Sequence, residues 1–273
     1  GHSGQDIDKE RQNADLLMAR MIQRLLKETK GQLVSFNGGT KDNAIPRECE
    51  ASLIYESDEE AAKAEELACE LAETYAEELT PAEPDFSCEI SCETNRTAEA
   101  IPQDAAKEFI CAMRLAPNGI QKRNIKMDGF VVVSLNLGVV RTEEDRIVMI
   151  FSPRSSVASL QEDTKERLNT LAETFGFTVS HSSEYPGWSF KEDSPVREIC
   201  KESYKELFGE DLKIEAIHAG LECGLFSDAI KGLDAIAIGP TIANCHTPDE
   251  YLTLDSFERF YEFLKDILSR LAK

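Results

Sequence analysis

The last third of the sequence carries one histidine in a position suited to bind a metal. His246 stands in the loop GPTIANCHTPDE (residues 239–250), which follows a predicted buried strand. Open α/β sheets bind their ligands at the loops that follow their strands. A histidine there can hold a metal through one ring nitrogen while a neighbour orients the other. A loop histidine that hydrogen-bonds the backbone explains the same position, and on spacing alone this second interpretation is favoured.

A second candidate segment, HAGLECGLF (residues 218–226), also follows a predicted strand. Its glycines, Gly220 among them, would let the backbone approach a ligand closely. Glu222 could bind a substrate amine or act as an acid or base. A tight strand-to-helix turn with a solvated glutamate explains the same residues, and on the residues alone this second interpretation is favoured.

Two polar positions stand out in the first half of the chain. Asn43 and Arg47 flank Ala-Ile-Pro after a glycine-rich turn, and Arg154 comes at the end of a predicted strand. Most single arginines are surface charges. An arginine just beyond a β-edge can instead hold a ligand carboxylate through two parallel hydrogen bonds.

The composition narrows the class of protein. The 273 residues include 30 Lys+Arg and 51 Asp+Glu, a net charge of −21 that repels phosphate backbones and argues against nucleic-acid binding. No apolar run reaches the roughly 20 residues of a membrane helix, and no secretory leader is visible. The eight cysteines are therefore expected to be reduced thiols in a cytoplasmic protein. Walker, dinucleotide-binding, serine-hydrolase and H-E-x-x-H motifs are absent from the sequence.

Hydrophobic periodicity predicts two similar α+β subdomains, over about residues 1–98 and 99–183. Each shows the order helix, strand, strand, helix, strand. Among these elements, helices are predicted at residues 58–79 and 103–115, and the last strands at residues 86–92 and 177–180. After the loop at residues 181–188 the pattern changes. Helices at residues 195–208 and about 254–271 alternate with strands at residues 212–217 and 234–238, which is typical of part of an α/β sheet.

Ten short motifs, in order along the whole chain, resemble the aminoacyl-histidine dipeptidases, which are di-zinc peptidases related to carnosinase. They are GHSG (1–4), FNGGT (36–40), NAIPRE (43–48), APNG (116–119), SLNLGVV (134–140), YPGW (185–188), SPV (194–196), IHAGLECGLF (217–226), IGPTI (238–242) and H-x-PDE (246–250). The resemblance implies an α+β lid of two ferredoxin-like subdomains over residues 1–183. The C-terminal portion of an α/β zinc-peptidase catalytic domain would follow over residues 184–273.

The resemblance also implies a role for each matched residue. His246 would bind one zinc, and His2 would stabilise the oxyanion of the tetrahedral intermediate. Substrate would be held by Asn43, by Arg154 through its free carboxylate, and by the loop that contains Gly220 and Glu222. The reaction implied is attack of a zinc-activated water on a dipeptide bond.

The family's other metal ligands, including an H-x-D motif, precede its lid, and this chain contains no H-x-D. We therefore expect two zinc ions in the intact active site, but little or no zinc binding and no dipeptidase activity for the 273-residue chain alone. The alternative is a non-catalytic, lid-derived module for binding or dimerisation. A small dipeptide is the expected substrate, a homodimer the expected assembly, and neither nucleic acid nor a membrane is an expected partner.

Overall fold

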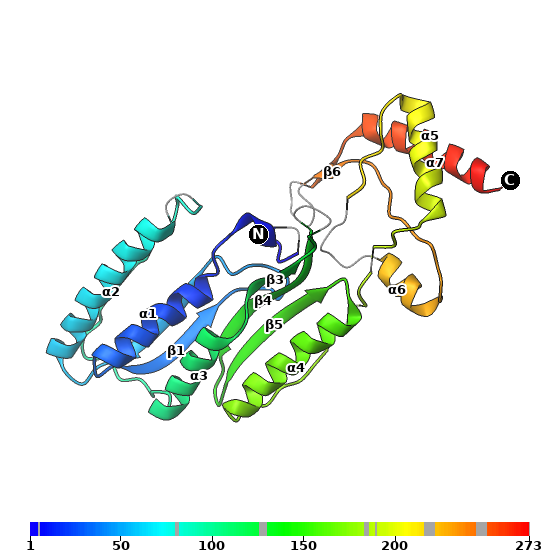
Figure 1. The fold of residues 1–273 in the computed structure, drawn as a ribbon. Helices are drawn as coiled ribbons and strands as arrows, with labels where there is room; N and C mark the ends of the chain where they lie inside the picture. The colour runs from blue at the N-terminus through cyan, green and yellow to red at the C-terminus, as the bar shows by residue number, and fades with distance from the viewer. Residues whose placement is uncertain are drawn as a thin grey trace. The chain divides into compact units, whose positions relative to one another are not determined.

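The computed structural model describes residues 1–4, 6–79, 82–125, 130–182, 186–188, 190–215, 222–243 and 250–272. The chain divides into two compact units, with the division between Glu184 and Tyr185. Each unit has a hydrophobic cluster of its own. Figure 1 shows the elements of both units.

The first unit is built on one five-stranded antiparallel sheet. Its strands are β1 (Gln32–Gly38), β2 (Cys49–Ile54), β3 (Gly119–Arg123), β4 (Val131–Thr142) and β5 (Ile147–Ser155). A short 3-10 helix (Ile7–Lys9) precedes the four helices, which are α1 (Ala14–Glu28), α2 (Asp58–Leu79), α3 (Gln103–Leu115) and α4 (Ala158–Thr174). Helices α2, α1 and α3 lie side by side, and α4 packs against β5 (Figure 1).

The core of the first unit lies between the helices and one face of this sheet. Ile22 and Leu25 of α1 and Ile110 of α3 are almost completely buried, and they cluster with Phe36 of β1 and Leu137 of β4. Side chains alternate between the two faces of a strand. Because Leu137 faces the helices, its neighbours Asn136 and Gly138 face the opposite side of the sheet.

Strand β4 holds the two halves of the first unit together. β5 pairs with one edge of β4 over Val133–Thr142, while β3 and β1 share the other edge. In the gap between β3 and β1, the Asn13 amide donates to the Leu137 carbonyl at 2.8 Å. The Asn118 side chain accepts from the Leu137 N–H at 2.9 Å. Two asparagines thus satisfy the backbone where no strand is adjacent.

This arrangement differs from the sequence-based expectation in two ways. The two halves, which were expected to form two similar subdomains, share one sheet. The predicted strands at residues 86–92 and 177–180 are not strands, because neither forms a ladder with a neighbour. Phe86, Cys88 and Ile90 nevertheless pack against the core, while the residues between them are exposed. The alternation of apolar and polar residues therefore correctly indicates which side chains are partly buried, although the segment does not pair with a strand.

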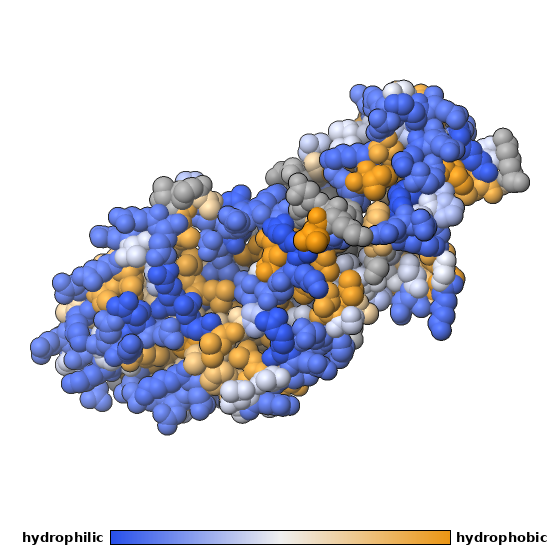
Figure 2. Space-filling model, viewed as in Figure 1, coloured by the Kyte–Doolittle hydropathy of each residue, from blue (hydrophilic) through white to orange (hydrophobic). Residues whose placement is uncertain are grey.

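The second unit is mainly helical in its described residues. It contains α5 (Pro195–Phe208), α6 (Glu222–Ala229) and α7 (Leu254–Leu271), with a two-stranded ladder of β6 (Ile242–Ala243) and β7 (Tyr251–Leu252). Its buried cluster joins Cys200 of α5 to Phe263 and Ile267 of α7. Apolar side chains such as Phe226 and Phe257 also reach the surface, and Figure 2 shows apolar surface on this unit among the hydrophilic residues.

The strands predicted at residues 212–217 and 234–238 are also wrong for the residues that are described. Leu212, Ile236 and Ile238 pack against the buried cluster, as a buried strand would. No neighbouring strand pairs with them in the described part of the unit, and a strand without a hydrogen-bonded neighbour is not stable.

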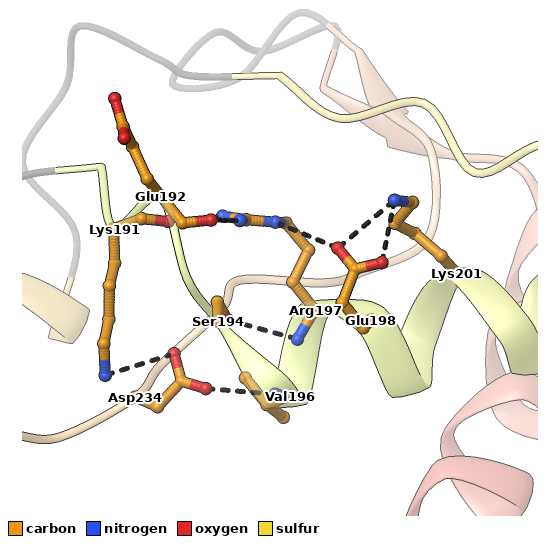
Figure 3. A network of polar contacts seen from close by, with 8 residues as sticks. All are labelled: Lys191, Glu192, Ser194, Val196, Arg197, Glu198, Lys201 and Asp234. Carbon is orange, nitrogen blue, oxygen red and sulfur yellow. Dashed lines mark hydrogen bonds and ion pairs between the residues drawn. The ribbon is translucent and has the colours of Figure 1, made fainter.

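The start of α5 is fixed by a polar network (Figure 3). Ser194 caps the helix by accepting from the Arg197 N–H at 3.2 Å, and Asp234 accepts from the Val196 N–H at 3.0 Å. The Arg197 guanidinium donates to the Lys191 carbonyl at 2.7 Å. These contacts join the segment before α5 to the segment after α6.

Candidate functional site

The loop after β1 packs on the face of the sheet opposite the helices. The Asn136 amide, which projects from β4 on that face, donates to the carbonyl oxygens of Asp42 at 3.1 Å and Ala44 at 2.8 Å. Asn136 is only 1 % exposed, so these bonds are made away from water. Its two contacts fix the backbone on both sides of Asn43.

Two glycines make this close packing possible. Gly39 has a φ of +66°, and a Cβ atom there would lie 1.9 Å from the carbonyl oxygen of Gly138. A Cβ on Gly138 would lie 2.5 Å from the carbonyl oxygen of Asp42. Any side chain at either position would push the loop away from β4.

The N-terminal residues pair with the same loop. His2 and Ala44 form an antiparallel bridge, the Ser3 N–H donates to the Asn43 carbonyl at 2.9 Å, and the Ile45 N–H donates to the Gly1 carbonyl at 2.9 Å. The Gly4 N–H donates to Nδ1 of His2 at 3.1 Å. A nitrogen that accepts a hydrogen bond carries no proton, so the neutral His2 ring has its proton on Nε2.

Arg154 belongs to the same face. It pairs across the ladder with Ser134, two residues before Asn136, and cross-strand partners project to the same side of a sheet. Its Nε is buried and has no hydrogen-bond partner among the residues that the structure describes. Burial lowers the pKa of Arg154 from its usual value, and the Asp42 carboxylate opposes this only in part. A buried cation with an unsatisfied donor favours an anion beside it.

The structure therefore brings three of the six predicted site residues to one region, namely His2, Asn43 and Arg154. Glu222 is the exposed first residue of α6 in the second unit. Gly220 and His246 lie outside the described residues. Within the described ranges, no group of three or more His, Cys, Asp or Glu side chains could hold a metal ion.

The sequence prediction missed two residues of this region, Asp42 and Asn136. Asp42 is the charged neighbour of Arg154, and Asn136 holds the loop that contains Asn43. Asn136 carried a usable signal, because it is a large polar residue inside an otherwise apolar strand, SLNLGVV. Such a residue needs a buried hydrogen-bond partner.

Residues 39–270 match the model of a peptidase family, described as peptidase family M20/M25/M40. The chain belongs to this family. The matched range includes Asn43 and Arg154 of the first unit, α5 and α6 of the second, and nearly all of α7. Together with the two dipeptidase relatives described next, this match confirms the expected resemblance to dipeptidases.

Two similar proteins are dipeptidases by name. The cytosol non-specific dipeptidase of Escherichia coli (strain K12) is 32% identical over 275 residues, which cover 99% of this chain and 56% of the relative. The crystal structure of aminoacylhistidine dipeptidase from Vibrio alginolyticus matches with a TM-score of 0.86 and 33% identity, over 99% of this chain and 55% of that chain. The chain thus spans about half the length of these relatives.

No helix among the described residues has both the length and the apolar character needed to cross a membrane.

Proposed function

We propose that this chain is part of a zinc-dependent dipeptidase. Residues 1–183 would form the lid, and residues 184–273 would form the C-terminal portion of the catalytic domain. The family match and the two related dipeptidases support this assignment. The observation that carries the proposal is the buried, unsatisfied Nε of Arg154 on the same face of the sheet as the loop that holds Asn43 and His2.

In this proposal Arg154 holds the free carboxylate of the dipeptide. A guanidinium can donate two parallel hydrogen bonds to a carboxylate, and burial strengthens that interaction. Asn43 would hold the substrate beside it, and Glu222 and Gly220 are further proposed substrate-binding residues.

His2 supplies the donor for the transition state. Because Nδ1 accepts from Gly4, Nε2–H is the donor that can stabilise the negative charge on the former carbonyl oxygen. Zinc, with His246 as one ligand, would activate the attacking water and polarise the peptide carbonyl when bound. We also propose a cytoplasmic location, in keeping with the name of the E. coli relative, and a homodimer.

The role of Arg154 can be tested with a pair of substrates that differ only in the carboxylate. In the complete gene product, Arg154→Met is expected to raise the KM for a dipeptide about 100-fold, since losing one partner of a buried charge pair costs about 2–5 kcal/mol. The KM for the same dipeptide as its C-terminal amide should change by less than about 3-fold. Steady-state kinetics on both substrates measures the difference.

The matched control for this test is Arg146→Met. Arg146 is exposed and forms a surface ion pair with Glu143 at 2.7 Å, so neither KM should change appreciably. An equal loss on the dipeptide and its amide in Arg154→Met would contradict a role in binding the carboxylate.

The overall proposal is tested by assaying the complete gene product and the 273-residue chain side by side, for dipeptide hydrolysis and for zinc content. The complete product should hydrolyse dipeptides and hold two zinc ions per active site, whereas the 273-residue chain should do neither. Absence of hydrolysis in the complete product would favour the non-catalytic module. Two tight zinc sites in the 273-residue chain would contradict the assignment of its residues.

A further inference from the structure

A separate cavity opens in the first unit where the N-terminus of α1 meets the end of α3. Its volume is about 320 Å³. None of the residues assigned above to substrate or metal lines it. Its lining includes Arg11, Arg20, Arg114, Asn13, Asn118 and Leu17.

Three arginines in one cavity are unexpected in a chain with a net charge of −21. Arg20 is held in place, because its guanidinium makes two bonds to Glu78, at 2.5 and 2.9 Å, and lies over the Tyr75 ring. Arg114, by contrast, is exposed and has no ion-pair partner among the described residues. One guanidinium of this cavity therefore forms no ion pair with a carboxylate of the described residues.

The chain already binds one carboxylate close to this cavity. Glu83 accepts from the backbone N–H of Gln12 at 3.1 Å and from the Arg11 guanidinium at 3.4 Å. Gln12 and Asn13 come just before α1, whose N-terminal end carries a partial positive charge. The Gln12 N–H is taken by Glu83, and the N–H groups of Asp15 and Leu16 are taken by Asn13. The arginine side chains would therefore supply the hydrogen bonds to a further oxyanion.

The cavity is also built on a rigid base. Asn13 and Asn118 are both bonded to the backbone of Leu137 in the centre of the sheet. Asn13 also caps α1 by accepting from the N–H groups of Asp15 and Leu16. A site on such fixed elements loses little entropy when a ligand binds.

We propose that this cavity binds a small organic anion through a phosphate or carboxylate group. Arg114 and Arg11 would hold the anionic group, since guanidinium groups match the geometry of both oxyanions. Leu17 would contact the apolar part of the ligand. A volume of about 320 Å³ is at the lower end of the range for small-molecule sites. This site is independent of the proposed dipeptidase activity.

Calorimetric titration of the 273-residue chain at constant ionic strength tests the proposal, with inorganic phosphate and succinate as separate probes. At least one probe should bind saturably, at one per chain. Arg114→Gln should weaken that binding at least 10-fold, because it removes the cation that lacks an internal partner. Tighter binding of phosphate would indicate a phosphorylated ligand, and tighter binding of succinate a carboxylate ligand.

Lys107→Gln is the matched control, because it removes one positive charge from the same helix at an exposed position outside the cavity lining. It should change the affinity less than 2-fold. In the unsubstituted chain, the side-chain amide signals of Asn13 and Asn118 should shift on titration in NMR spectra. Absence of saturable binding of both probes, or equal weakening by the two variants, would overturn the proposal.

Discussion

Replacing Gly39 by alanine is expected to destabilise the first unit by about 4 kcal/mol. Two costs add up at this position. A residue with a side chain is strained at a φ of +66°, which costs about 1 kcal/mol. The new Cβ would also lie 1.9 Å from the Gly138 carbonyl oxygen, and relieving a clash with buried backbone costs about 3 kcal/mol. Because natural domains are stable by only about 5–15 kcal/mol, this is a large fraction of the total.

Gly176→Ala separates the two costs. Gly176 has a φ of +67°, almost the same as that of Gly39, but no atom lies within 4 Å of its Cβ position. Its replacement should therefore cost only about 1 kcal/mol. The stability of both variants is measured in urea by the hydrogen exchange of the α1 and β4 amides. Tryptophan fluorescence would not report on the first unit, because the single tryptophan, Trp188, belongs to the second unit. Equal costs for the two variants would mean that the loop yields easily.

Asp15→Asn is expected to stabilise the first unit at pH 8 by up to about 4 kcal/mol relative to the unsubstituted chain. Asp15 is completely buried, and its oxygens accept no hydrogen bond from an N–H or O–H group. Burial raises the pKa of Asp15 to about 7, and the neighbouring Cys49 thiol offsets this only in part. The shift from 3.8 is about three pKa units, each worth about 1.4 kcal/mol.

The sign of the effect follows from which state ionises first. Below about pH 4 the carboxyl is protonated in both the folded and the unfolded chain, so it imposes no penalty. Between about pH 4 and pH 7 the unfolded chain ionises while the folded chain does not, and folding becomes progressively less favourable. Above about pH 7 the penalty is constant. The advantage of Asp15→Asn should therefore grow from pH 4 to pH 7 and then level off.

Free energies of unfolding at pH 4, 5, 6, 7 and 8 measure this dependence. Asp163→Asn, at an exposed position of α4, is the control and should differ from the unsubstituted chain by less than about 0.5 kcal/mol throughout. A difference between Asp15→Asn and the unsubstituted chain that does not vary with pH would show that the buried carboxyl keeps an ordinary pKa.

The sequence was most informative where local signals define an element. Helix α5 runs over the predicted residues 195–208, because Ser194 caps its start, proline follows the cap, and Gly209 ends it in a left-handed conformation. The helices at residues 58–79 and 103–115 also have their predicted bounds. In each case the apolar spacing that indicates the helix lies within the segment itself.

Elements that depend on distant partners were harder to predict. β3 has the sequence GIQKR, which shows no apolar alternation, and it is a strand only because β4 lies beside it. The segment at residues 234–238 shows the opposite case, since it has the composition of a buried strand but pairs with no other strand in the described part of the chain.

Dependence on residues distant in the sequence also limited the prediction of the site. Arg154 and Asn43 were found as candidates from motifs. Local spacing does not show that Asn136 hydrogen-bonds the carbonyls of Asp42 and Ala44, because these residues lie more than 90 positions earlier in the chain. Asp42 has no local signal either, because its importance lies in its charge beside Arg154.

The position of β4 has a consequence for biosynthesis. The Phe36 N–H of β1 donates to the Thr142 hydroxyl, 106 residues later. A chain that emerges N-terminus first at about 5–20 residues per second leaves this edge of β1 without its partner for several seconds or longer. Unpaired β-edges can associate with other chains. Nascent chains of this protein should therefore be most open to chaperone binding, and most prone to aggregate, until the ribosome has released residue 142.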